Sequence, residues 1–259
     1  MAEYLDINGV HTWFDQVGEG DPVVLLHGGL TDSQEFALTT PAIAAEFHTY
    51  LPERRGHGHT PDVEGPISYD LMADDTIAFL EASVERAAHL VGHSDGANVA
   101  LLVALKRPDL VRRLVLISAN FHHDGLIPGA VDVDQVMGMV ADHYAAVTPD
   151  GAEHLPIVAA KVGRMFDEEP TLTVADLAGV RARTLVMCAD DDAITLEHTI
   201  ALYRGIPRSE LAVVPGTSHV LVLEKPELCN KLIVDFLTTD APPTFWPLRR
   251  RDLLHDPAG

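Results

Sequence analysis

Short, continuously apolar runs alternate along the chain with longer segments in which apolar residues recur at helical spacing. The short runs predict buried strands and the longer segments predict helices. Regular alternation of the two predicts a parallel sheet with helices on both faces, which is an α/β fold. Apolar residues on either side of Asn8-Gly9 predict a hairpin at the start, because this dipeptide tolerates the positive φ of a tight turn. The predicted strands are 23–26, 47–51, 89–91, 114–118, 184–188 and 211–214, and the predicted helices are 69–82 and 97–107.

The rhythm changes between residues 124 and 179, where glycines and prolines interrupt helical patches such as 136–146 and no convincing strand is found. Such punctuation marks turns between short helices. We therefore expect a helical cap at about 124–179, inserted into a single domain 1–259 whose core is 1–123 and 180–239. Four large apolar residues of the cap are interpreted as packing residues rather than ligand contacts: Met137, Met139, Met165 and Phe166.

The C-terminal tail, 240–259, differs from the rest of the chain in composition. It contains Pro242-Pro243 and three consecutive arginines, Arg249 to Arg251. A short charge run usually marks a solvated segment. We interpret the tail as solvated and packed by Phe245 and Trp246, rather than as a specific partner site.

The chain has 259 residues, 47% of them hydrophobic, and a formal net charge of −21. The negative charge opposes binding to nucleic acids and anionic membranes, so a small molecule is the expected partner, and the oligomeric state stays open. No apolar run approaches the roughly 20 residues that span a bilayer, and the start of the chain lacks the features of a signal peptide. We therefore expect a cytoplasmic location. Cys188 and Cys229 lie in apolar stretches and are expected to be buried structural thiols.

The most informative motif is Gly92-His93-Ser94-Asp95-Gly96, between a predicted strand and a predicted helix. This is the G-x-S-x-G pattern in the strand-turn-helix context that it requires. The serine sits at a strained turn, and the glycines are needed because side chains there would collide with neighbouring backbone. The turn also places Ser94 at a helix N-terminus, where free N–H groups and the helix dipole stabilise an oxyanion. Ser94 is therefore the predicted nucleophile.

At these residues the chain resembles the α/β-hydrolase family, and the resemblance extends from Val10 to Leu237. It implies a mostly parallel eight-stranded sheet flanked by helices, with a helical cap insertion. His27-Gly28-Gly29 matches the segment from which family members supply the second half of the oxyanion hole. The resemblance therefore implies that the backbone N–H groups of Gly29 and Asp95 form the hole.

A second matching segment, Arg54-Arg55-Gly56-His57-Gly58-His59-Thr60, resembles the R-G-x-G-x-S pattern of the family. Threonine stands last, and Glu53 replaces the usual aspartate. We interpret the segment as structural, because its glycines make a tight loop and its arginine usually anchors chain segments in this family.

His219 is the predicted general base. It ends the segment Pro215-Gly216-Thr217-Ser218-His219, after the last predicted strand, where the family places its base. Such a base needs a hydroxyl on one ring nitrogen and a carboxylate on the other, which fixes the tautomer and stabilises the imidazolium. The chain order serine, aspartate, histidine is the order expected of this fold. Other histidines are interpreted as surface residues, among them His11, His143, His154, His198 and His255.

The acid that orients the histidine is predicted to be Asp192. The stretch Ala189-Asp190-Asp191-Asp192 resembles the family's G-x-x-D, with alanine in place of glycine. The resemblance then implies that Asp190 is a buried turn residue that binds loop amides, and we interpret Asp191 as facing solvent. Two alternatives stay open: Asp190 itself, and an acid after the preceding predicted strand, where Asp124 is the nearest carboxylate.

The sequence does not indicate a metal or a cofactor. His122-His123-Asp124 gathers ligand types, but adjacent histidines in an extended segment are expected to point in opposite directions, and no second cluster with metal spacing follows. No G-x-G-x-x-G or Walker sequence follows a predicted strand, so no nucleotide or flavin is expected. We therefore predict no metal and no cofactor.

A serine, a histidine and an aspartate beside an oxyanion hole perform acyl transfer. The predicted reaction is hydrolysis of a small-molecule carboxylic ester through an acyl-enzyme intermediate. A serine nucleophile argues against the family's haloalkane dehalogenases and epoxide hydrolases, which use aspartate, and against its dienelactone hydrolases, which use cysteine. The alternatives are a cofactor-free perhydrolase of the haloperoxidase type, a lactonase, a C–C hydrolase, and a slow-turnover ligand-binding receptor on the same fold.

The residue after the nucleophile bears on the substrate. Ser94-Asp95-Gly96 resembles the amino-acid ester hydrolases that cleave valacyclovir, in which the corresponding aspartate pairs with the substrate's ammonium group. This resemblance implies that Asp95 binds a substrate cation and that the ester is an α-amino acid ester. The alternative is that Asp95 contributes only its backbone N–H and a local hydrogen bond.

Overall fold

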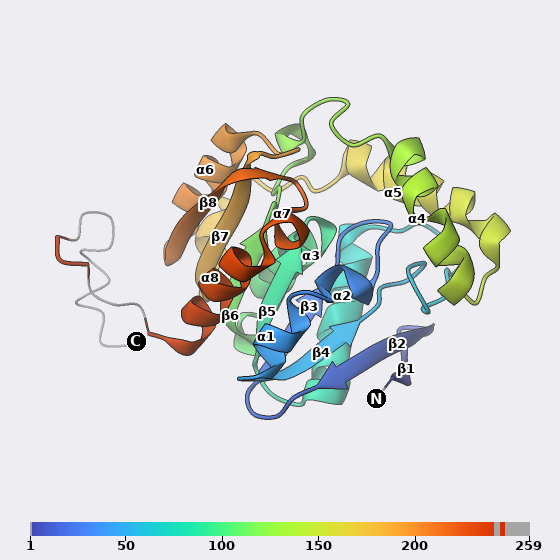
Figure 1. Cartoon of the computed structure of the whole chain (residues 1–259), viewed down its shortest axis with the longest axis horizontal. Helices are drawn as coiled ribbons and strands as arrows, with labels where there is room; N and C mark the ends of the chain where they lie inside the picture. The colour runs from blue at the N-terminus through green and yellow to red at the C-terminus, as the bar shows by residue number, and fades with distance from the viewer. Residues whose placement is uncertain (1, 241–243, 247–259) are drawn as a thin grey trace.

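The computed structural model describes residues 2–240 and 244–246. This part of the chain contains one eight-stranded sheet (Figure 1). Its strands are β1 Glu3–Ile7, β2 Val10–Val17, β3 Pro22–Leu26, β4 His48–Pro52, β5 Ala88–His93, β6 Val111–Ile117, β7 Arg183–Asp191 and β8 Ser209–Ser218. Their order in the sheet is β1-β2-β4-β3-β5-β6-β7-β8. β2 pairs antiparallel with β1 and with β4, whereas the other neighbouring pairs are parallel. The predicted fold, a mostly parallel eight-stranded sheet flanked by helices, is confirmed.

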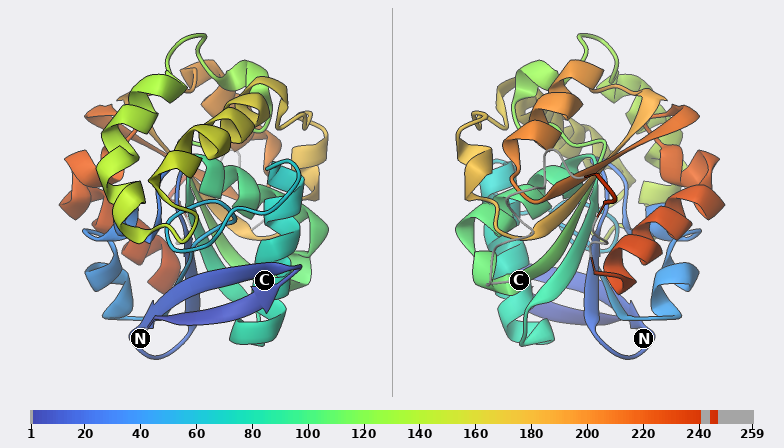
Figure 2. Two further views of the ribbon diagram at one scale, coloured as in Figure 1. Left: turned by 90° about the vertical axis from the view of Figure 1, so that its right-hand side faces the viewer. Right: turned by 90° about the vertical axis from the view of Figure 1, so that its left-hand side faces the viewer.

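Helices cover both faces of the sheet (Figure 2). They are α1 Thr40–Ala44, α2 Tyr69–Phe79, α3 Asp95–Lys106, α6 Leu196–Gly205, α7 Leu221–Glu224 and α8 Pro226–Thr238. All five residues of β3 are buried, as expected for a strand covered on both faces. Alternate side chains enter opposite cores: Val24 and Leu26 pack with residues of α2, α3 and α6, whereas Val23 and Leu25 pack with residues of α1, α7 and α8.

The hairpin and the first long helix, both predicted from local sequence, are present in the structure. Asn8 and Gly9 connect β1 to β2 with φ of 49° and 82°, which confirms the predicted hairpin. α2 begins after Ser68, whose side chain accepts a hydrogen bond from the backbone of the first turn. The predicted helix 69–82 continues past α2 as a π-helical turn, Leu80–Val84, which ends at Glu85 in the left-handed region.

Between β6 and β7 the described chain forms helices and no strand. The two longest are α4 Val133–Val147 and α5 Leu155–Glu168, and both lie beyond the carboxyl ends of the central strands (Figure 1). Side-chain contacts connect them to loops of the core: His143 of α4 lies 2.5 Å from Asp32, and Lys161 of α5 lies 2.6 Å from Asp62. The boundaries of the cap as a structural unit stay a prediction.

Two packing predictions are wrong. Met139 is 70% exposed, because α4 is covered on one side only, while Met165 of α5 is buried as expected. Phe245 and Trp246 are fully or largely exposed, so they do not pack the tail. The arginine run Arg249–Arg251 lies outside the described residues.

Cys188 and Cys229 are both buried and are not in disulfides, which confirms their interpretation as interior thiols. Burial raises the pKa of each thiol to about 11, so neither is a thiolate near neutral pH. Across the residues that the structure describes, no helix is long and apolar enough to cross a membrane.

Candidate active site

Ser94 lies in the sharp turn between β5 and α3. Its φ of 51° falls in the left-handed region, which residues other than glycine rarely adopt. The flanking glycines are required by packing: a Cβ at Gly92 would collide with the carbonyl group of Gly96, and a Cβ at Gly96 would collide with that of Leu26. The turn therefore presents the Ser94 hydroxyl at the carboxyl end of the sheet. It also begins α3 at Asp95, whose N–H has no carbonyl partner within the helix.

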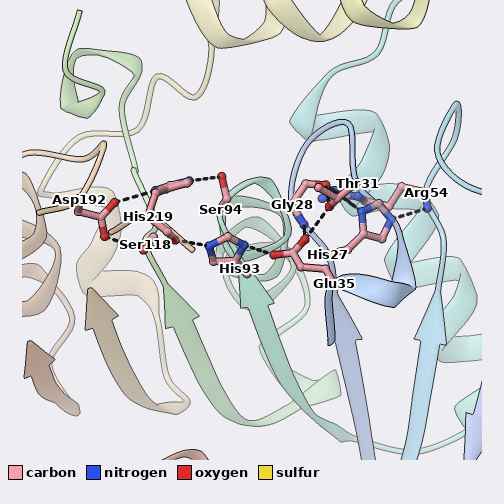
Figure 3. Close-up of polar contacts among 10 residues, drawn as sticks. All are labelled: His27, Gly28, Thr31, Glu35, Arg54, His93, Ser94, Ser118, Asp192 and His219. Carbon is pink, nitrogen blue, oxygen red and sulfur yellow. Dashed lines mark hydrogen bonds and ion pairs between the residues drawn. The ribbon is translucent and has the colours of Figure 1, made fainter. Parts of the chain in front are cut away.

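The structure brings Ser94, His219 and Asp192 together from the ends of β5, β8 and β7 (Figure 3). The Nε2 atom of His219 lies 3.0 Å from Ser94 Oγ, and Nδ1 lies 2.7 Å from Asp192 Oδ1. The second oxygen of Asp192 accepts hydrogen bonds from the Ser118 hydroxyl at 2.6 Å and the Ala189 N–H at 3.0 Å. Burial alone would raise the pKa of Asp192, but these donors and His219 lower it to about 2. The carboxylate is therefore ionised and oriented toward the ring.

The alternative acids make other contacts. Asp190 accepts a hydrogen bond from the backbone N–H of Thr217 at 3.1 Å, and this contact holds the pKa of Asp190 below its usual value. It binds a loop amide as expected, but it is exposed, so the expectation that it is buried is wrong. Asp124 is exposed and lies beside His122. In the described chain the carboxylate that contacts the ring of His219 is Asp192.

Two histidines interpreted as surface residues, His154 and His198, are partly buried. His198 stacks on Phe121 with 3.9 Å between ring centroids, and its Nε2 accepts the backbone N–H of Phe121 at 3.1 Å. Because burial lowers the pKa of His198 to about 4, the ring is neutral near pH 7. It fixes the loop that follows β6.

The same loop carries the group of residues that could hold a metal ion. The ligand atoms of His122, His123 and Asp124 lie within 4.8 Å of one another. The expectation that the two rings point in opposite directions is wrong: they stack with centroids 4.4 Å apart, because a 3-10 turn starts here instead of an extended segment. His122 Nδ1 already accepts the N–H of Asp124, so this nitrogen is engaged within the turn.

The loop after β3 is packed tightly against the turn at Ser94. A Cβ at Gly29 would collide with the carboxylate of Asp95 and would lie 2.9 Å from the ring of Phe166. Arg54 Nη2 donates to the carbonyl oxygen of Gly28 at 2.7 Å. The arginine thus anchors this loop, as the structural interpretation of residues 54–60 expects.

Asp95 is almost completely buried, and only one of its carboxylate oxygens has a hydrogen-bond partner in the described chain. Oδ1 accepts the Tyr69 hydroxyl at 2.7 Å, whereas Oδ2 has none. Burial raises the pKa of Asp95, and the nearby charge of Arg54 opposes that effect. An unpaired carboxylate oxygen in such surroundings is costly unless a donor from a ligand approaches it.

A cavity of about 390 Å³ opens between the carboxyl ends of the strands and the cap. Both Ser94 and His219 line it, as do Asp95 and Met139, so Met139 borders the ligand space instead of packing the cap. Its described lining has acidic groups and no lysine or arginine. The other lining residues are Gly28, Gly29, Leu30, Thr31, Glu35, Tyr69, His93, Asn120, Leu126, Ala130, Val131, Asp132, Gln135, Val136, Val140, Phe166, Glu169, Ala193, Ile194, Val220 and Leu223.

Four polar residues beside the site were not predicted from the sequence. All four make contacts between distant parts of the chain. Tyr69 contacts Asp95, Ser118 contacts Asp192, and His93 contacts the backbone of His219. The fourth, Glu35, contacts His93. The sequence feature that marks Ser118 and His93 is a polar residue at the end of an apolar strand. This feature does not show which residue each of them contacts.

Comparison with known proteins places this geometry in a family. The family described as the alpha/beta hydrolase family matches residues 23–232. Serine hydrolase BPHL of Homo sapiens is 27% identical over 247 residues, covering 89% of this chain and 84% of that protein. The 2-hydroxymuconate semialdehyde hydrolase of Pseudomonas sp. (strain CF600) is 26% identical over 257 residues, with coverage of 88% and 91%. Among solved structures, Est816, described as an N-acyl homoserine lactone degrading enzyme, has a TM-score of 0.74 and 26% identity, covering 90% of this chain and 100% of that one. The chain therefore belongs to the α/β-hydrolase family and is a hydrolase.

Proposed function

We propose that the protein is a serine hydrolase that cleaves a small-molecule carboxylic ester through an acyl-enzyme intermediate. The observation that supports this is the 3.0 Å distance between Ser94 Oγ and His219 Nε2, with Asp192 2.7 Å from the other ring nitrogen. A neutral histidine that donates its Nδ1–H to the carboxylate leaves Nε2 free to accept the hydroxyl proton.

In this mechanism Ser94 Oγ attacks the ester carbonyl carbon while its proton passes to His219 Nε2. The backbone N–H groups of Gly29 and Asp95 stabilise the oxyanion. When the tetrahedral intermediate collapses, the C–O bond to the alcohol breaks and His219 gives the alcohol its proton. Water then attacks the acyl-enzyme with His219 as base, and release of the acid restores the Ser94 hydroxyl.

The substrate that suits the cavity best is an ester with a positively charged amino group. Asp95 lines the cavity and has an unpaired carboxylate oxygen, and Glu169 and Asp132 add further acidic groups to the lining. An ammonium group donates charge-assisted hydrogen bonds and offsets the burial of the carboxylate. We therefore assign Asp95 as the residue that binds the α-ammonium group of an amino acid ester.

A lactone is the second candidate substrate. It is a cyclic ester and would follow the same steps, and the likeness to a structure described as an N-acyl homoserine lactone degrading enzyme favours it. A substrate that carries a carboxylate fits less well, because the described lining of the cavity has no lysine or arginine to bind it.

The substitution Ser94→Ala tests the proposal. It removes only the hydroxyl, so thermal unfolding should be nearly unchanged, while turnover of a p-nitrophenyl ester should fall at least about a hundredfold. Turnover above about 1% of the wild-type rate would contradict covalent catalysis by Ser94.

A further inference from the structure

A buried chain of contacts lies directly below the serine and the histidine (Figure 3). His93, the residue before Ser94, has its Nε2 2.7 Å from the backbone carbonyl oxygen of His219. Its Nδ1 is in contact with Glu35 Oε1. Glu35 Oε2 accepts the N–H of Gly28 at 2.6 Å and lies 2.5 Å from the Thr31 hydroxyl. The His93 and Glu35 side chains are 4% and 5% exposed, so water does not screen their interaction.

The acceptors around His93 determine where its protons lie. A carbonyl oxygen can only accept, so Nε2 must carry a proton to bind His219. Glu35 accepts donors at its other oxygen, which favours its ionised form, so the proton between the two side chains belongs to His93 Nδ1. Burial alone would lower the pKa of His93, but Glu35 and the His219 carbonyl raise it above its usual value. Burial alone would raise the pKa of Glu35, but the charge of His93 and the donors around the carboxylate lower it to about 2.

Other charges near the pair agree with this assignment. Asp192 also raises the pKa of His93. Burial lowers the pKa of Arg54 and raises that of Asp95; the charge of Glu35 opposes the first effect and adds to the second. The carboxylates of Glu35 and Asp192 thus both favour the charged form of His93.

We propose that Glu35 and His93 form a permanent imidazolium–carboxylate pair that positions the general base and the oxyanion loop relative to Ser94. The imidazolium holds the backbone of His219, and the carboxylate holds the N–H of Gly28, the residue before Gly29. One rigid connection thus joins the two parts of the site that must be aligned on the serine. The inference rests on the proposed function, because the two are positioning residues for that acyl transfer.

Nuclear magnetic resonance of the free enzyme tests the charge state without any substrate. In protein with ¹⁵N-labelled histidine, the His93 ring is identified as the signal lost in His93→Gln. At a pH of about 7.5, above the ordinary histidine value of about 6.5, both ring nitrogens of His93 should carry protons, and Glu35→Gln should remove one of them. A ring with one bare nitrogen in the wild-type protein would overturn the proposal, whether or not Ser94 is the nucleophile.

Kinetics test the positioning role. Glu35→Gln keeps the size of the side chain and removes its charge, and it should lower kcat for a neutral ester at least about tenfold while KM changes less than about threefold. Glu46→Gln, the same change at an exposed position, is the matched control and should leave both constants unchanged. A smaller loss in kcat, or a loss carried by KM, would overturn the positioning role.

The double variant Glu35→Gln with His93→Gln separates positioning from folding. Each single variant leaves one buried ionisable side chain without its partner, so the double variant should unfold at a higher temperature than either. Its kcat should nevertheless stay at least about tenfold below wild type, because the connection between the two loops is lost. Recovery of wild-type kcat together with stability would show that the pair is merely structural.

Discussion

At the scale of single residues, the carboxylates of Asp192 and Asp190 differ in what they bind. Asp192 contacts the ring of His219, whereas Asp190 accepts a loop amide. We expect Asp192→Asn to lower kcat about a thousandfold or more, because the amide favours the wrong tautomer of His219. Asp190→Asn should chiefly lower stability. Steady-state kinetics and thermal unfolding of both variants check this, and an inactive Asp190→Asn beside an active Asp192→Asn would reverse the assignment.

The carboxylate of Asp95 carries the prediction about substrate choice. Its unpaired oxygen should bind an ammonium group, so α-amino acid esters should be cleaved with kcat/KM at least about tenfold above their N-acetylated counterparts. Asp95→Asn keeps the backbone N–H and the acceptor for Tyr69, and it should remove that preference while retaining activity on neutral esters. The measurement is kcat/KM for each matched pair of esters. Equal values for charged and neutral esters with the wild-type enzyme would leave Asp95 with only a structural role.

At the scale of elements, a strand or a turn could be predicted where consecutive residues have the same surroundings or a local conformational preference. β3 is apolar throughout because both of its faces are covered, and Asn8-Gly9 adopts the turn that its own φ preferences favour. The exposure of Met139 could not be predicted in this way, since helical spacing alone does not tell which neighbour a helix face meets. His198 was missed for the same reason, as its partner Phe121 is distant in sequence.

The attachment of α5 to the core gives a prediction about stability. Asp62 binds Lys161 and His154; burial would raise its pKa, but these partners hold it below the usual value. Because the pKa of Asp62 is lower in the folded state, its contacts contribute fully to stability above the pKa of about 3.9 in the unfolded chain. This contribution is lost as the pH falls. Asp62→Asn should therefore lower the melting temperature by about 2–4 °C at neutral pH and by less at pH about 3. Asp167→Asn, an exposed change on the same helix, is the control, and an equal difference at both pH values would contradict the account.

At the scale of the whole molecule, the formal charge of −21 and the acidic lining of the cavity act in the same direction. Both attract cations at long range, and salt screens that attraction. We expect kcat/KM for a cationic ester to fall at least about twofold when ionic strength rises from about 0.01 M to 0.5 M, with no change for a neutral ester. A parallel response of the two esters would show that the charge does not steer the substrate.

The whole fold also shows which parts of the site were beyond prediction. The G-x-S-x-G turn could be predicted from its motif between a strand and a helix, and His219 and Asp192 could be predicted from the resemblance to the α/β-hydrolase family. All three follow predicted strands, and parallel strands bring their carboxyl ends to one edge. The pairing of Glu35 with His93 could not be predicted, because it depends on how the segment after β3 packs against the end of β5. Buried polar contacts of this kind are set by tertiary packing and leave no periodic signal.

The central claim is that Ser94 is the nucleophile, and covalent labelling tests it most directly. A fluorophosphonate probe forms a stable phosphonyl ester with a serine that an adjacent base activates. Mass spectrometry of the digested protein should find one adduct, on the peptide that contains Ser94, and none in Ser94→Ala. An adduct on another residue, or ester hydrolysis that continues after Ser94 is fully labelled, would contradict the account.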